Sequence, residues 1–346
     1  MKILITGVHG FVGSNLVKAL SKEHTIYGLD IISPVKDGVR FTFSWDFLEK
    51  SDEIPEVDAI IHLAGKAHDT KNQTVSDVYF KVNTGLTQKI YDYFLASKTA
   101  KKFIFFSTAK AAADRVDGVL TEDVVPAPIG PYGESKIAAE KYILDRIANP
   151  DIKGSESEIT NLRQQLGGQQ SGGEQLGGQQ KVYILRPCMI HGPGNKGNLN
   201  LLYGVVKKGI PWPLGAFENK RTFTSIDNLC FIIKGLLTQD VKSGIYNIND
   251  DEAVSTNELI DIICSALGKK ARIWRIPRGL MEGMAKMGGW LHLPLNPERL
   301  QKLTENYVSS NAKIKRALGI DRLPVRAKDG LTKTIKAFSV EKPEHP

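Results

Sequence analysis

The sequence has few cysteines, and none of them is arranged to bind a metal. Cys188, Cys230 and Cys264 lie far apart in a chain of 346 residues. An odd and sparse set of thiols is typical of reduced cytosolic proteins, so we expect a cytoplasmic location. The seven histidines show no HxxxH or similar spacing. The sequence therefore predicts no metal site, and it predicts core or surface roles for the histidines.

Long apolar runs and blocks of positive charge are also missing. No window approaches the roughly 20 uncharged apolar residues that span a bilayer, and no charged leader precedes the first apolar strand. We therefore expect neither a membrane span nor a signal peptide. The net charge is +8, but the lysines and arginines are scattered and are not interleaved with aromatic residues. This pattern favours a solvated surface and does not predict nucleic-acid binding.

The first half of the chain alternates short apolar runs with helical periodicity. Strands are predicted at residues 2–5, 25–29, 39–44, 57–63, 102–106 and 182–185. Helices are predicted between them at residues 12–21, 75–97 and 132–147. Such alternation is typical of the α/β class, in which a doubly wound parallel sheet is covered by helices on both faces.

The second half changes character at Pro193–Pro213, which is rich in glycine, proline and asparagine. Helices are predicted at 226–237, capped by Ser225 or Asp227, and at 256–267, capped by Ser255. We expect a first domain at residues 1–192 and a smaller, mostly helical lobe at 193–346, with about 226–250 returning to the first domain. Gly279–Trp290 is predicted to be a packed helix of this lobe, with a membrane or partner contact as the alternative.

One segment fits neither half. Residues 166–180 read LGGQQ, SGGEQ and LGGQQ in tandem, within a stretch from 154 to 180 that has no aromatic residue. Such a segment cannot bury enough apolar surface to offset the entropy of ordering. We predict a disordered low-complexity insertion here.

Three glycines, spaced three apart, follow the first predicted strand. A GxxGxxG stretch between a strand and a helix is typical of a phosphate-binding turn. We expect Gly7 to make the tight turn, Gly10 to let the backbone approach a pyrophosphate, and Gly13 to let the helix pack closely. The start of the helix offers free N–H groups and a partial positive charge to the phosphates.

Two acidic residues follow the next two predicted strands. Asp30 ends the second strand, where a carboxylate would meet the ribose hydroxyls of an adenosine. A carboxylate there would repel a 2′-phosphate, which favours NAD over NADP. Asp46 follows the third strand and is a candidate acceptor for the adenine amino group, with a plain strand-end position as the alternative.

A tyrosine and a lysine stand four apart in the stretch PYGESK. Residues i and i+4 share a helix face, so Tyr132 and Lys136 point the same way. A free tyrosine is a poor base at neutral pH, but a nearby ammonium and an oxidised nicotinamide favour the phenolate and lower its pKa. Thr108 ends the preceding strand and can share a hydrogen bond with a reacting hydroxyl.

Together these motifs resemble the extended short-chain dehydrogenase/reductases, within the NAD-dependent epimerase/dehydratase family. The resemblance rests on GVHGFVG, HLAG at 62–65, the asparagine of VNTGLT, the Ser107-Thr108 pair, YGESK and RPCMIHGPG at 186–194. It implies a Rossmann fold and Thr108, Tyr132 and Lys136 as the catalytic triad. The cofactor-binding residues that it implies, besides those above, are Phe11, Val12, Leu63, Ala64, Gly65, Asn83, Lys136 and Arg186.

The resemblance also implies a nucleotide-linked sugar as substrate, with UDP as the expected nucleotide. Its diphosphate would meet Arg221, with Arg299 as a second phosphate arginine and Asn198 near the nucleotide. Lys110 is a candidate contact to the sugar, although a solvated lysine is an equal alternative. Family members often form homodimers through two helices per subunit, here 75–97 and 132–147.

Departures from the family pattern narrow the expected reaction. Dehydratases carry an Asp-Glu pair after the threonine, whereas here Ala109 and Lys110 follow, so 4,6-dehydration is not expected. Ala112-Ala113-Asp114 replaces the usual Val-Tyr-Gly, and His191 stands where many relatives have tyrosine. We expect a UDP-sugar 4-epimerase that works through a 4-keto intermediate. The alternatives are an NAD(P)H-dependent reductase of a UDP-4-keto-6-deoxy sugar and a dinucleotide sensor without activity.

Overall fold

The computed structural model describes residues 1–48, 54–67, 75–148, 180–195, 197–290 and 296–340. The insertion predicted at 154–180 therefore lies outside the described residues, apart from Gln180. Among the helices of the described ranges, none combines the length and the apolar composition needed to cross a membrane.

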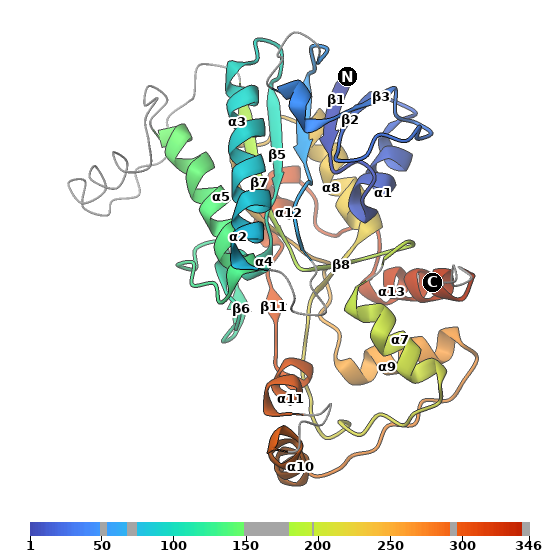
Figure 1. The fold of residues 1–346 in the computed structure, drawn as a ribbon. Helices are drawn as coiled ribbons and strands as arrows, with labels where there is room; N and C mark the ends of the chain where they lie inside the picture. Colours follow the sequence, from blue (N-terminus) through green and yellow to red (C-terminus); the bar gives the residue numbers. More distant parts are fainter. Residues whose placement is uncertain (49–53, 68–74, 149–179, 196, 291–295, 341–346) are drawn as a thin grey trace, which may run out of the picture.

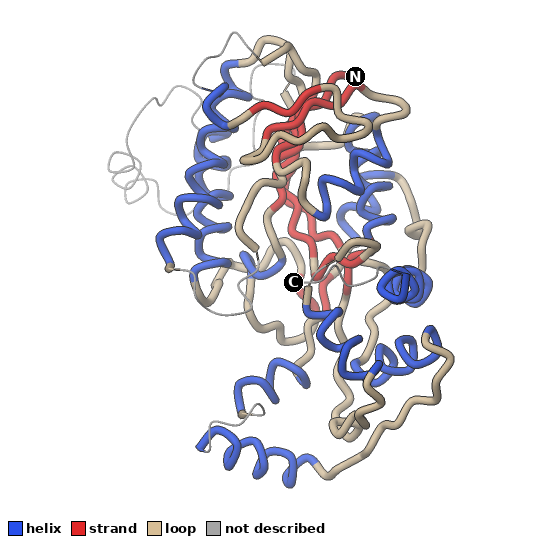
Figure 2. Tube along the Cα trace, turned by 45° about the vertical axis from the view of Figure 1, so that its right-hand side comes forward, coloured by secondary structure: helices blue, strands red, loops and turns tan. Residues whose placement is uncertain are grey.

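A seven-stranded parallel sheet forms the centre of the molecule (Figure 2). Its order is β10-β7-β5-β4-β1-β2-β3. The chain starts in the middle at β1, runs outward to β3, and returns to β4 on the other side of β1. The strands are β1 (Lys2–Thr6), β2 (Thr25–Leu29), β3 (Phe41–Phe43), β4 (Ala59–His62), β5 (Lys102–Phe106), β7 (Lys181–Pro187) and β10 (Gly244–Ile248). This confirms the doubly wound parallel sheet and places its topological switch between β1 and β4, where such sheets bind ligands.

Helices cover both faces of this sheet because its strands are apolar on both sides. In β1, Ile3 and Ile5 face one layer and Leu4 faces the other. The first layer holds α1 (Phe11–Leu20), α8 (Ile226–Thr238) and α12 (Ala312–Leu318). The second holds α3 (Leu86–Ala96) and α5 (Pro131–Ala148), which lie on the opposite side of the sheet (Figure 1).

The helix predicted at residues 75–97 is divided into three pieces. It consists of α2 (Ser76–Tyr79), a π-helical segment η2 (Phe80–Gly85) and α3. Short π-helical segments are rare and occur frequently at functional sites. Asn83 lies inside this one.

A second hydrophobic cluster forms the lobe below the sheet in Figure 1. It is built on α7 (Asn198–Lys207), α9 (Thr256–Ala266), α10 (Arg278–Trp290), α11 (Pro297–Thr304) and α13 (Ala327–Val340). The predicted serine caps are present, since Ser225 accepts a hydrogen bond from the Asp227 amide and Ser255 forms a capping box with Glu258. The helix α7 lies in the glycine- and proline-rich stretch and was not predicted.

The helix α10 packs through one face only. Met281 is buried, whereas Met284 and Met287 are exposed. The prediction of a packed helix is therefore correct for Met281, and the other two methionines face away from the lobe core.

Several short elements complete the fold. They are η1 (Trp45–Leu48), α4 (Ala109–Ala112), and two small parallel sheets, β6 (Val119–Leu120) with β11 (Val308–Ser309) and β8 (Met189–His191) with β9 (Phe223–Ser225). Because β8 follows β7 directly and β6 follows α4, both small sheets lie near the carboxyl edge of the large one.

Candidate active site

The glycine-rich turn joins β1 to α1. Gly7 has a φ of 68°, a left-handed conformation that favours glycine, and its amide donates to the Leu29 carbonyl at 2.8 Å. A Cβ on Gly13 would lie 2.4 Å from the Gly7 carbonyl oxygen and 2.8 Å from the Val8 Cα. The structure therefore needs glycine at both positions for the reasons predicted, a tight turn and a closely packed helix.

The start of α1 is open to an anion. Gly10 is its N-cap and supplies no side-chain cap, so the first-turn amides, such as those of Phe11 and Val12, have no intrahelical acceptor. The Asp30 carboxylate borders this turn and accepts from the His9 amide at 3.0 Å. Asp46 lies in η1 after β3 and is exposed. Turn, helix start and Asp30 together have the form and charge that suit the pyrophosphate and ribose of NAD.

The segment Leu63–Gly65 passes directly beneath the glycine turn. The amides of Leu63 and Ala64 donate to the Thr6 hydroxyl at 3.1 and 3.0 Å. A Cβ on Gly65 would lie 2.9 Å from Asn83 Oδ1 and 3.0 Å from Lys136 Nζ. This loop therefore connects the turn at β1 with the asparagine of η2 and the lysine of α5.

Asn83 is fully buried and joins this loop to α5. Its side-chain oxygen accepts from the Lys66 amide at 2.7 Å, and its amide group donates to the Lys66 carbonyl at 3.1 Å and to Ser135 Oγ at 2.9 Å. Ser135 Oγ in turn donates to the Tyr132 carbonyl at 2.9 Å. The sequence did not identify Ser135, because its partner Asn83 lies 52 residues away in the chain.

His62 extends the same buried network. Its ring nitrogens lie 2.7 Å from the Thr6 hydroxyl and 2.9 Å from the Thr87 hydroxyl. Burial lowers the pKa of His62 well below its usual value, and the Lys136 ammonium lowers it further. The imidazole is therefore neutral at pH 7 and has the core role predicted for the histidines.

The three predicted catalytic residues meet at the carboxyl end of β5. Tyr132 lies beside Thr108, whose side chain favours the phenolate and which is the N-cap of α4. The Lys136 ammonium is buried, donates to the Phe106 carbonyl at 2.8 Å and lies 5.0 Å from the centre of the Phe105 ring. A hydroxyl group, a phenol and an ammonium therefore converge where parallel sheets form their sites.

The electrostatics of the tyrosine differ from the sequence expectation. Burial raises the pKa of Tyr132, and the Thr108 side chain opposes this only in part. Burial also lowers the pKa of Lys136, to about 8. The ammonium is directed at the Phe106 carbonyl, so the expected lowering of the Tyr132 pKa is not present in the protein alone.

Arg186 is placed differently from the expectation. The resemblance implies a contact with the cofactor, whereas the guanidinium is 1 % exposed and pairs with Glu140. Nε lies 3.0 and 3.2 Å from the two carboxylate oxygens, and Nη2 lies 2.5 Å from Oε2. Arg186 thus contributes to the core beside the site and not to its surface.

The predicted substrate residues are spread over the junction with the lobe. Arg221 is bonded to the Lys302 and Glu305 carbonyls after the last turn of α11, and Arg299 is exposed on the first turn of that helix. Lys110 forms an ion pair with Asp114 at 2.5 Å. Asn198 is the first residue of α7, and its side chain lies outside the described part. Arg221 thus contacts the C-terminal end of α11, Arg299 lies on its first turn, and Lys110 lies two residues from Thr108.

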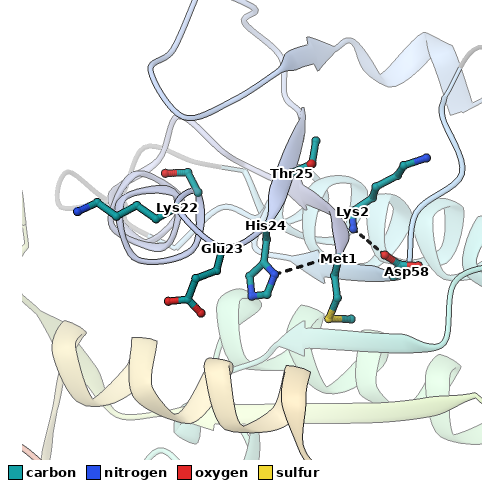
Figure 3. Close-up of a pocket in the computed structure, with 8 residues that line it drawn as sticks. Met1, Lys2, Lys22, Glu23, His24, Thr25 and Asp58 are labelled. Carbon is teal, nitrogen blue, oxygen red and sulfur yellow. Dashed lines mark hydrogen bonds between the residues drawn. The ribbon is translucent and has the colours of Figure 1, made fainter.

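An open cavity of about 440 Å³ lies at the other edge of the sheet (Figure 3). There the Met1 amino group lies 3.5 Å from His24, and the Lys2 amide donates to Asp58 at 2.6 Å. This cavity is at the amino ends of β1 and β2, whereas the predicted site residues gather at the carboxyl ends. We therefore assign it no part in the chemistry.

Comparison with known proteins agrees with this geometry. Residues 3–163 match the model of the NAD dependent epimerase/dehydratase family. A UDP-glucose 4-epimerase of Vibrio cholerae is 32% identical over 291 residues, covering 80% of this chain and 78% of the relative. A dTDP-4-dehydro-6-deoxyglucose reductase of Escherichia coli is 23% identical, covering 78% of this chain and 83% of the relative.

A solved structure shows the same fold. The UDP-glucuronic acid 4-epimerase of Bacillus cereus, solved in complex with NAD, superposes with a TM-score of 0.69 at 20% identity and covers 99% of this chain and 100% of its own. With these likenesses, the dinucleotide sensor without activity is set aside. The chain belongs to the NAD-dependent epimerase/dehydratase family, as an enzyme of the extended short-chain dehydrogenase/reductase type.

Proposed function

We propose that this enzyme is an NAD-dependent 4-epimerase of a UDP-linked sugar. The observation that carries the proposal is the convergence of Thr108, Tyr132 and the buried Lys136 at the carboxyl end of β5. Such a group can remove and return the proton of a sugar hydroxyl. The likeness to the Vibrio cholerae UDP-glucose 4-epimerase supports the choice of reaction and nucleotide.

The residues that would hold NAD are those of the glycine turn and its neighbours. Gly7 and Gly10 lie in the turn, and Gly13 lets α1 pack closely against it, since a Cβ there would lie 2.4 Å from the Gly7 carbonyl oxygen. The amides of α1 would bind the pyrophosphate, and Asp30 the adenosine ribose. When bound, NAD supplies a hydride acceptor and a positive charge.

The protein's own residues would move the proton. Tyr132, as phenolate, takes the proton of the sugar 4-hydroxyl while the C4 hydride leaves, and the C4–O bond becomes a ketone. Thr108, which lies beside Tyr132, would orient the sugar hydroxyl. After the sugar turns its other face, the hydride returns and Tyr132 gives the proton back to the oxygen. One cycle thus inverts C4 without net oxidation.

The lobe would hold the nucleotide. Arg221 and Arg299 are guanidinium groups near α11, and guanidinium matches phosphate geometry. Arg221 is bonded to carbonyls at the end of α11, so a diphosphate would compete with these acceptors for it. Asn198 and Lys110 are the proposed contacts to the nucleotide and the sugar. We also propose residues 1–192 as the cofactor domain and 193–346 as the substrate lobe.

The structure also bears on the oligomeric state and the cellular compartment of the enzyme. We propose a homodimer built on α3 and α5, which pack side by side on one face of the sheet. We also propose that the enzyme works in the cytoplasm, since its three cysteines are free. Sedimentation of the purified protein tests the dimer, and a mass of one chain would exclude it.

The amount of NAD that the purified enzyme retains is expected to be close to one per chain. An epimerase must keep its dinucleotide through each cycle, since the hydride that leaves the sugar must return to it. Acid release and chromatographic measurement of the nucleotide check this. A site that binds NADH or NADPH only reversibly, with turnover of a UDP-4-keto-6-deoxy sugar, would support the reductase alternative. The Escherichia coli relative of this chain is a reductase of a 4-keto-6-deoxy sugar nucleotide.

A further inference from the structure

The side chain of Glu140 lies behind the proposed catalytic residues and has no part in the mechanism above. It is fully buried on α5, one turn after Lys136. Both of its oxygens accept hydrogen bonds from Arg186, and Oε1 also accepts a short one from the Ser107 hydroxyl. The carboxylate therefore joins α5 to β7 and to the residue that follows β5.

These contacts of Glu140 lie next to the proposed catalytic residues Thr108 and Lys136. Ser107 directly precedes Thr108, and Phe106, whose carbonyl accepts from Lys136, precedes Ser107. The end of β5 is thus bonded to successive turns of α5, through Lys136 and through Glu140. Moving Glu140 would change how Thr108 faces Tyr132 and Lys136.

A buried ion pair costs much desolvation and contributes little net stability compared with an apolar pair. Arg186 Nη1, moreover, has no hydrogen-bond partner among the described residues. A contribution to folding stability therefore does not by itself explain the Glu140–Arg186 ion pair. We propose that Glu140 is a positioning residue, whose carboxylate fixes the end of β5 against α5 and with it the Phe106 carbonyl that accepts from Lys136.

The charges around Lys136 support this role. Burial lowers the pKa of Lys136 to about 8, and Glu140 opposes that effect. The other titratable groups nearby are His62 from β4, which is neutral, and Tyr132 on the same helix. Arg186 of β7 pairs with the carboxylate. Glu140 is thus the anion that favours the protonated lysine.

The experiment follows the titration of Lys136 itself, by NMR of protein labelled at the lysine side-chain carbons, with Lys136→Arg used to assign the signal. Wild-type Lys136 should titrate near pH 8. In Glu140→Gln the pKa of Lys136 should be lower by about one to three pH units, as expected for loss of a nearby opposite charge. Ser107→Ala removes a hydrogen bond but keeps the carboxylate, so the lysine should titrate as in wild type.

Glu140→Gln leaves the buried Arg186 without its ion-pair partner, and the variant can fail to fold for that reason. The double variant Glu140→Leu/Arg186→Met is then used in its place. This pair of substitutions removes both charges and should also lower the titration of Lys136. The proposal is overturned if a folded variant without the carboxylate leaves the titration of Lys136 unchanged.

The kinetic consequence rests on the proposed function. The basic limb of the pH–rate profile for UDP-sugar turnover should move to lower pH in both carboxylate variants and stay in place in Ser107→Ala. The NMR titration needs no substrate. If the wild-type enzyme epimerises no UDP-sugar, the proposed function fails while the titration still decides the role of Glu140.

Discussion

Replacing Tyr132 by phenylalanine is expected to lower kcat by about 10²–10⁴-fold, the usual contribution of a positioned acid or base. The substitution removes only the hydroxyl group that lies beside Thr108, and the ring keeps its packing against Tyr79 at 6.4 Å between centres. NAD content and thermal stability should therefore stay close to wild type. Turnover of a UDP-sugar and the released dinucleotide are the two measurements.

Tyr142→Phe is the matched control for this variant. Tyr142 lies on the same helix, and its hydroxyl bonds to Asp92 and Arg146, away from the site. The control should keep full activity. A folded Tyr132→Phe protein with wild-type kcat would show that the phenol does not move the proton.

The substitution Gly13→Ala is expected to abolish NAD retention and to lower the free energy of unfolding by about 1–3 kcal/mol, the usual cost of overpacking. The new Cβ would meet backbone atoms of the glycine turn at 2.4 and 2.8 Å. Backbone atoms cannot move out of the way by a rotamer change as a side chain can. The helix α1 must therefore shift away from the glycine turn. Denaturant unfolding and the NAD content of the purified variant measure the two effects.

Gly283→Ala provides the control for this prediction. Gly283 lies within α10, and a Cβ there meets nothing within 4 Å. Alanine should leave NAD content unchanged and raise helix stability by about 0.5–1 kcal/mol. If Gly13→Ala retained NAD and stability as this control does, the turn would not be packed as described.

The sheet could be predicted from the sequence because its strands carry their own signal. The bounds expected for β2 and β5 agree with the structure residue for residue. These strands are buried on both faces, so a short apolar run between turn residues is sufficient to locate them. The elements β6, β8, β9 and β11 have two or three residues each, and their pairing partners lie far away in the chain. Such short segments show no periodicity.

The sequence identified the catalytic residues of the site but not their pKa values or their hydrogen-bond partners. Local motifs identified Thr108, Tyr132 and Lys136, because their spacing reflects one helix face and one strand end. The raised pKa of Tyr132 and the pairing of Arg186 depend on burial and on long-range partners. The π-helical segment at Asn83 likewise depends on contacts with Lys66 and Ser135. None of these is visible in a local pattern.

The central claim, that one enzyme removes and returns the same C4 hydride, is tested most directly with UDP-sugars deuterated at C4. UDP-glucose and UDP-N-acetylglucosamine are the first substrates, incubated with the purified enzyme and no added dinucleotide. We expect one of them to give its C4 epimer with the deuterium still at C4. Conversion that needs added NADPH, or a product that has lost the deuterium, would contradict the account.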